Sequence, residues 1–180
     1  MRALHRLPQR RLTAGAHRVR SALTTGSELP FLGERLQLRV SAGDPPRVHR
    51  DGTRLLVQVA FPLSKNLRPL LESWYRRQAW VHLPPRLQQL ARTLDVRPAK
   101  LTIRSQKTRW GSCSSFGTIS LNWRLMLLPA ALVDYVLAHE LCHLRYLDHS
   151  PSFWRLVSML VPDYAERQAR LRKVQQGLAL

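Results

Sequence analysis

The sequence predicts an α+β fold, because strand-like and helical patterns occupy different parts of the 180-residue chain. Residues 30–62 carry alternating apolar side chains between turn signals, which is typical of short strands. Apolar residues at helical spacing dominate residues 64–94 and 129–174, and two strand-like runs lie between them. A chain of this length with 44% hydrophobic residues can bury a core without disulfides, and two cysteines are too few for a disulfide scaffold.

The first third of the chain divides into a basic tail and a small β subdomain. Residues 1–27 hold six arginines and no acidic residue, and we expect a disordered tail there. Residues 28–62 are expected to form a β-meander of two or three strands. The strands are predicted around residues 32–40 and 55–60, with turn signals at residues 44–46 and 51–52.

Residues 63–180 are predicted to form the main domain. Helical spacing begins near Ser64, and Pro84, together with the proline that follows it, is expected to restart a helix. Strands are expected at residues 101–104 and 117–123, where β-branched and apolar residues follow turn signals.

Three helices are predicted toward the C-terminus. Pro129 opens the strongest of them, since proline is tolerated in the first helical turn. Ser150 is expected to cap the next helix, because it precedes a proline and an apolar run. Pro162 then separates that helix from a charged terminal helix over residues 164–174.

The charge is strongly positive. Lys and Arg number 29 and Asp and Glu 11, so the formal net charge is +18. This excess predicts attraction to polyanions such as nucleic acid, although a solvated arginine-rich surface has the same composition. No apolar run is long enough to span a membrane, and no apolar segment of a secretory signal follows the N-terminal arginines. An organellar transit peptide would share that composition, but we expect a monomeric, cytoplasmic protein.

The clearest chemical signal is the sequence HELCH at residues 139–143, inside the strongest predicted helix. His139 and His143 are four residues apart, so both imidazoles lie on one helical face and can reach one metal ion. Glu140 lies beside that face, where it can accept a proton from a water molecule that the metal activates. The motif therefore predicts a catalytic metal site.

A catalytic zinc site needs a third protein ligand besides His139 and His143. His149 follows six residues after His143, and a tight turn would bring it back to the metal. Glu166 on the terminal helix is the alternative and would give two imidazoles and one carboxylate. Imidazole ligands suit zinc, and one Zn²⁺ per chain is expected.

The residues around this motif resemble those of the YgjP-like family, small zinc metallopeptidases related to the SprT-like and WLM groups. The resemblance is dense from Arg104 to Tyr164. The matching segments are KTRWGSCSS (107–115), ISLNWR (119–124), DYV (134–136), HELCHL (139–144) and HSPSFW (149–154).

The resemblance implies a minimal zincin-like metallopeptidase core, in which the HExxH helix packs under a small antiparallel sheet. It implies His149 as the third zinc ligand and Glu140 as the general base for hydrolysis of peptide bonds. The edge strand of the family would come from residues 109–123 and would pair with an extended protein or peptide substrate.

Several other residues are candidates for the site, although each is also typical of packing or of a surface. Asp148 is a candidate for orienting a ligand histidine, and a weaker one is Asp134. Candidates for contact with the substrate are Arg109, Asn122 and Trp123, and candidate donors to the oxyanion are Tyr164, Tyr146, Asn122 and Arg109.

A function of a different class stays open beside the peptidase. The positive charge and the relation to SprT-like proteins suit a nucleic-acid-associated protease that DNA stimulates. They also suit a basic binding module in which zinc only shapes the fold. Both alternatives predict DNA binding that weakens steeply with salt.

Overall fold

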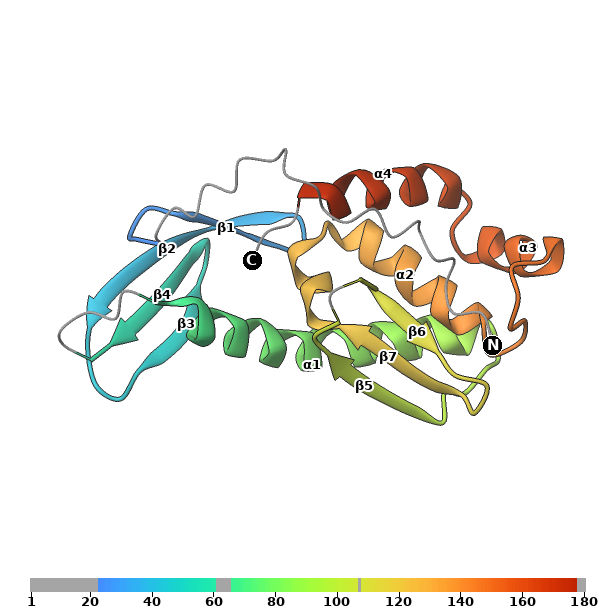
Figure 1. Ribbon diagram of the computed structural model, residues 1–180, viewed down its shortest axis with the longest axis horizontal. Coiled ribbons are helices and arrows are strands. Elements are labelled where there is room, and N and C mark those ends of the chain that lie inside the picture. Colours follow the sequence, from blue (N-terminus) through green and yellow to red (C-terminus); the bar gives the residue numbers. More distant parts are fainter. Residues whose placement is uncertain (1–22, 61–65, 107, 178–180) are drawn as a thin grey trace.

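The computed structural model describes residues 23–60, 66–106 and 108–177 (Figure 1). Of the disordered tail predicted for residues 1–27, residues 1–22 lie outside the described ranges. The described part is an α+β fold with four α-helices and two small mixed sheets. The predicted fold class is therefore confirmed.

The N-terminal sheet has four strands rather than the two or three of the predicted meander. Its order is β1 (Glu28–Phe31), β2 (Glu34–Ala42), β4 (Arg54–Val59) and β3 (Arg47–Asp51). The β2 and β4 strands are parallel, whereas the two outer pairs are antiparallel. The meander was wrong because β2 and β4 carry the buried leucines and valines, so these two strands pair at the centre. The largely exposed β3 is left at an edge.

Helix α1 (Arg68–Thr93) is continuous, although two helices were predicted. An interior proline costs a helix roughly 3 kcal/mol, and both Pro84 and Pro85 lie inside α1. One buried stripe continues past both prolines, so packing on a common core outweighs their cost. The buried residues of this stripe are Leu71, Trp74, Tyr75, Ala79, Leu83, Leu87 and Ala91.

The second sheet lies beside α1 and has the order β5 (Lys100–Arg104), β7 (Thr118–Asn122), β6 (Gly111–Cys113). The β6 and β7 strands form an antiparallel hairpin, but β5 runs parallel to β7. The sheet is therefore mixed, and the expected purely antiparallel pairing was wrong. Because β6 pairs with one edge of β7, only the other edge of β7 is free, and β5 pairs with it. In this register Leu101 and Ile103 of β5 lie beside Ile119 and Leu121 of β7.

Helix α2 (Ala130–Cys142) lies between α1 and α4 (Tyr164–Gly177) and contacts both (Figure 1). It follows the short 3₁₀ helix η1 (Trp123–Leu127), and every residue from Tyr135 to Cys142 is buried. Helix α1 is tied to α2 by an ion pair between Arg86 and Asp134. On the other side, α4 donates from the Arg167 guanidinium to the Ala131 carbonyl over 2.9 Å.

Helix α3 (Pro151–Leu160) begins where the Ser150 hydroxyl accepts a hydrogen bond from the Phe153 N–H, as the predicted cap requires. It contacts α2 and lies near the C-terminal end of that helix, and the chain then returns along α2 as α4 (Figure 1). Across the described ranges, no helix combines the length and the apolar character that crossing a membrane requires.

Candidate metal centre

Three histidines converge at the C-terminal end of α2. His139 lies in the last turn of the helix, His143 is its C-terminal cap, and His149 follows in the loop before α3. The Nε2 atom of His139 is 3.3 Å from that of His143 and 3.2 Å from that of His149. The three side chains thus form a group that can hold a metal ion, and no other such group occurs among the described residues.

The surroundings of His139 and His143 favour the form of each imidazole that binds metal. The Nδ1 atom of His143 lies 2.9 Å from the Tyr146 carbonyl. A carbonyl oxygen only accepts, so Nδ1 carries the proton and the Nε2 lone pair points to the cluster. Burial, then His143 and His149, lower the pKa of His139 to about 2, so its ring is neutral at ordinary pH.

Aromatic rings enclose the cluster. The Phe153 ring is fully buried, and its centroid lies 4.6–4.9 Å from those of all three imidazoles. Trp154 stacks on His149 with centroids 5.6 Å apart, and Tyr164 stacks on Trp154 at 5.2 Å. No role in the centre was predicted from the sequence for Phe153 and Trp154. The sequence signal that could have indicated their role is their position in the first turn of the helix that starts after His149.

Glu140 is the fourth functional group of the centre. It is 1% exposed, and neither carboxylate oxygen has a hydrogen-bond partner in the described structure. Burial raises the pKa of this carboxyl group, and the charge of Arg109 opposes the shift. An unpartnered carboxylate is costly to bury, so its retention here indicates a group that acts on something bound beside it.

Gly111 on β6 makes the burial of Glu140 sterically feasible. A Cβ atom at residue 111 would lie 2.7–2.9 Å from the Glu140 side chain, closer than real Cβ atoms approach their neighbours. Only glycine therefore lets the strand cross directly over the carboxylate. Sequence analysis did not single out this residue, because the contact joins segments that are 29 positions apart.

Asn122 and Trp123 support the loop that precedes β6. The Asn122 amide donates to the carbonyls of Gln106 and Arg109 over 2.7 and 2.9 Å, and its oxygen accepts from the Arg124 N–H. The Trp123 indole donates to the Ser105 hydroxyl over 3.1 Å. Both side chains are almost completely buried, whereas Arg109 is exposed.

The remaining candidates lie at the rim or outside it. Asp148 is exposed beside His149, and hydrogen bonds from Ser150 lower the pKa of its carboxyl group. Tyr146 is exposed and contributes its carbonyl to His143, as described above. Glu166 is exposed on α4, 3.9 Å from Arg170, and is not part of the histidine group.

The two cysteines are not part of the histidine group either. Burial raises the pKa of Cys142 to about 12 and that of Cys113 to about 11, so both thiols stay protonated. Both are unpaired. The donor set of the centre is therefore three imidazoles, with one carboxylate beside them.

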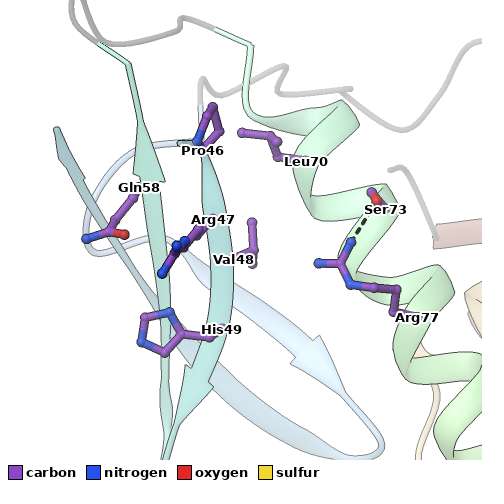
Figure 2. Close-up of a pocket in the computed structure, with 8 residues that line it drawn as sticks. All are labelled: Pro46, Arg47, Val48, His49, Gln58, Leu70, Ser73 and Arg77. Carbon is purple, nitrogen blue, oxygen red and sulfur yellow. Dashed lines mark hydrogen bonds between the residues drawn. The ribbon is translucent and has the colours of Figure 1, made fainter. Parts of the chain in front are cut away.

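A concavity lies away from the histidine cluster, between β3 and α1 (Figure 2). Its volume is about 530 Å³. Figure 2 shows the hydrogen bond that Arg77 donates to the Ser73 hydroxyl on α1, across from β3, which carries Arg47 and His49. Its lining contains no carboxylate and no thiol, and one histidine alone does not make a metal site.

The chain is similar to known metallopeptidases. The YgjP-like metallopeptidase domain family matches residues 3–174 of the chain. The chain is also similar to the crystal structure of the metallopeptidase zymogen of Pyrococcus abyssi abylysin, with 29% sequence identity and a TM-score of 0.47. That match covers 53% of this chain and 97% of the other. Among curated protein sequences, none matches.

Gly111→Ala is expected to lower the free energy of unfolding by about 1–3 kcal/mol, because the new methyl group overlaps the Glu140 side chain. Gly43→Ala is the matched control, since its methyl group would meet only the flexible Gln58 side chain. Chemical denaturation measures both. The cost at residue 111 should largely disappear in a chain that also carries Glu140→Ala, and a strictly additive double variant would contradict the contact.

Trp154→Ala is expected to raise the dissociation constant for zinc about tenfold or more, because His149 loses the ring on which it stacks. Trp154→Phe keeps a stacking partner and should recover most of the affinity. Competition with a chromogenic chelator measures the constant, and Trp80→Ala on the exposed face of α1 is the control. Unchanged affinity in Trp154→Ala would show that the stack does not position His149.

Proposed function

The chain belongs to the YgjP-like metallopeptidase family, and from this membership we propose that it is a zinc-dependent peptidase that hydrolyses peptide bonds. The observation that carries the proposal is the cluster of His139, His143 and His149 with the unpartnered Glu140 beside it. Three imidazole donors and one unpartnered carboxyl group match the needs of metal-assisted hydrolysis.

The histidine spacing supports zinc as the metal. Zinc–nitrogen bonds of 2.0–2.1 Å at tetrahedral angles place ligand nitrogens about 3.3–3.4 Å apart. The Nε2 separations of 3.2 and 3.3 Å agree with this value. When bound, zinc would supply Lewis acidity, which lowers the pKa of water and polarises a carbonyl group. Three protein ligands leave the fourth position open.

Glu140 acts as the general base in this proposal. Its raised pKa moves the carboxyl group toward the operating pH, where a base both accepts and returns a proton efficiently. Its buried oxygens have no competing donor, so they are available to the attacking water and then to the leaving amine. The charge of Arg109 opposes the effect of burial and lowers that pKa.

The edge strand β6 is the proposed binding surface for the peptide. It ends the β5-β7-β6 order and lies directly over Glu140 through Gly111. An extended substrate added to this edge would pass the histidine cluster. Asn122 and Trp123 then act indirectly, by holding the loop that carries Arg109, which is exposed and remains the proposed direct contact.

Two residues at the rim of the centre, Asp148 and Tyr164, are proposed to position its groups and to bind the oxyanion. Asp148 fixes the loop before α3 through Ser150 and so helps to orient His149. Tyr164 supports Trp154 by stacking, and its hydroxyl group is a proposed donor to the oxyanion.

The unpaired cysteines of the described chain support a reducing, cytoplasmic location.

Purified protein is expected to contain about one zinc per chain, and His149→Ala is expected to lose it or to bind it far more weakly. The reason is that two imidazoles alone leave the ion underligated. Mass spectrometry of the metal content measures the outcome. Glu166→Ala is the control and should keep its zinc. Loss of zinc in the control alone would move the third ligand to α4.

Glu140→Gln is expected to keep its zinc and to lower kcat/KM for peptide hydrolysis by at least about 100-fold, since an amide cannot accept the proton. A library of fluorogenic peptides supplies the substrate, and Glu166→Gln on the exposed face of α4 is the control. Hydrolysis at the wild-type rate in Glu140→Gln would exclude this residue as the base.

We propose association with nucleic acid as a second function. The observation that favours it is the net charge of +18. Six acidic side chains of the described residues form ion pairs with arginines, and the acidic residues are too few to neutralise the remaining bases. Binding would rest on counterion release from phosphates and would weaken steeply with salt.

A further inference from the structure

The second sheet turns an entirely polar face to solvent. Ile119 and Leu121 on β7 are fully buried and point toward the core. Thr118 and Ser120 alternate with them, so these two side chains point away from the core, as do the residues paired with them on β5 and β6. In Figure 1 the sheet lies in front of α1. The residues of the polar face are Lys100, Thr102, Arg104, Ser112, Thr118 and Ser120. Asn122, in the row of Arg104, shares this face but is buried, because its amide donates to the carbonyls of Gln106 and Arg109.

This face lies in a segment without acidic residues. From Val96 to Val133 the sequence contains six bases and neither Asp nor Glu. Elsewhere in the described structure arginines pair with carboxylates, but no such ion pair includes Lys100 or Arg104, and both are exposed. The positive potential over this sheet is therefore not neutralised locally.

Hydroxyl groups fill the space between the two bases. Ser112, Ser120 and Thr102 lie in one row across the three strands, and the Thr102 hydroxyl donates to that of Ser120 over 2.9 Å. Lys100 and Arg104 lie at the two ends of β5, about 13 Å apart at the usual rise per residue. Every described side chain on this face can donate a hydrogen bond.

We propose that this face binds the sugar-phosphate backbone of nucleic acid. The inference rests on the second function proposed above and does not depend on the peptidase activity. Lysine, arginine and hydroxyl side chains are the groups that contact phosphates without reading sequence. A polymer with closely spaced charges engages both ends of β5 at once, which a single small anion does not.

Two other partners fit the face less well. Binding in a membrane interface needs an apolar face, and the six outward side chains provide none. A peptide strand is bound by a free sheet edge rather than by a flat side-chain surface. Gly111 packs on Glu140 from the inward side of the sheet, so the buried carboxyl group and the proposed nucleic-acid face lie on opposite sides of the sheet.

The test is fluorescence anisotropy with a labelled 30-base-pair DNA and with its single strand, over a range of salt concentrations. The double variant Lys100→Glu with Arg104→Glu is compared with Arg47→Glu and Arg54→Glu, which lie exposed on the N-terminal sheet. Both double variants lower the net charge from +18 to +14. Zinc content and circular dichroism check that each variant is folded.

We expect the sheet variant to bind DNA at least tenfold more weakly and to lower the salt slope for duplex DNA by about 2, because two phosphate contacts are lost. The control should change affinity less than threefold. Thr102→Val with Ser120→Ala leaves the charge unchanged and should weaken binding about threefold.

Three outcomes would overturn the inference in distinguishable ways. No binding by the wild type at low salt would remove the nucleic-acid function altogether and leave the peptidase proposal untouched. Equal losses in both charge variants would leave nucleic-acid binding in place but not at this face. Loss of binding to polyglutamate or to anionic vesicles in the sheet variant, with DNA binding intact, would assign the face to a different partner.

Discussion

The burial of Glu140 beside three histidines is the constraint on which the rest of the structure depends. Removing such groups from water costs several kcal/mol for the carboxylate alone, unless the site returns that energy on binding its ligand. The fold must therefore enclose the C-terminal half of α2 with closely packed apolar elements. Helices α1, α3 and α4 and strand β6 of the second sheet all contact α2.

The same enclosure fixes the geometry of the centre. Phe153 contacts all three imidazoles, and the rings of Trp154 and Tyr164 extend the stack from His149 toward the surface. Aromatic rings have few rotatable bonds, so they hold a neighbouring ring at little cost in conformational entropy. A loop residue such as His149 thereby gains an orientation that its own backbone does not impose.

Local signals in the sequence were enough to predict α2 and the position of His139 and His143 on one of its faces, because Pro129 at its start and the four-residue histidine spacing belong to one helix. The pairing of strands was not predictable in the same way. Whether β5 runs parallel to β7 depends on which edge the hairpin leaves free. The continuity of α1 through Pro84 and the contact between Gly111 and Glu140 also depend on tertiary packing, which a local pattern does not contain.

Helix α1 has a consequence for how proteins of this architecture can change during evolution. Its 26 residues span about 39 Å, and its buried stripe belongs to one hydrophobic core that includes residues of both sheets. The Tyr75 hydroxyl also donates to the Pro30 carbonyl over 2.7 Å. The N-terminal sheet is therefore not an interchangeable module. A lineage that lost it would have to replace the cover over the first half of α1, and recombination at residues 61–65 would expose apolar surface in both products.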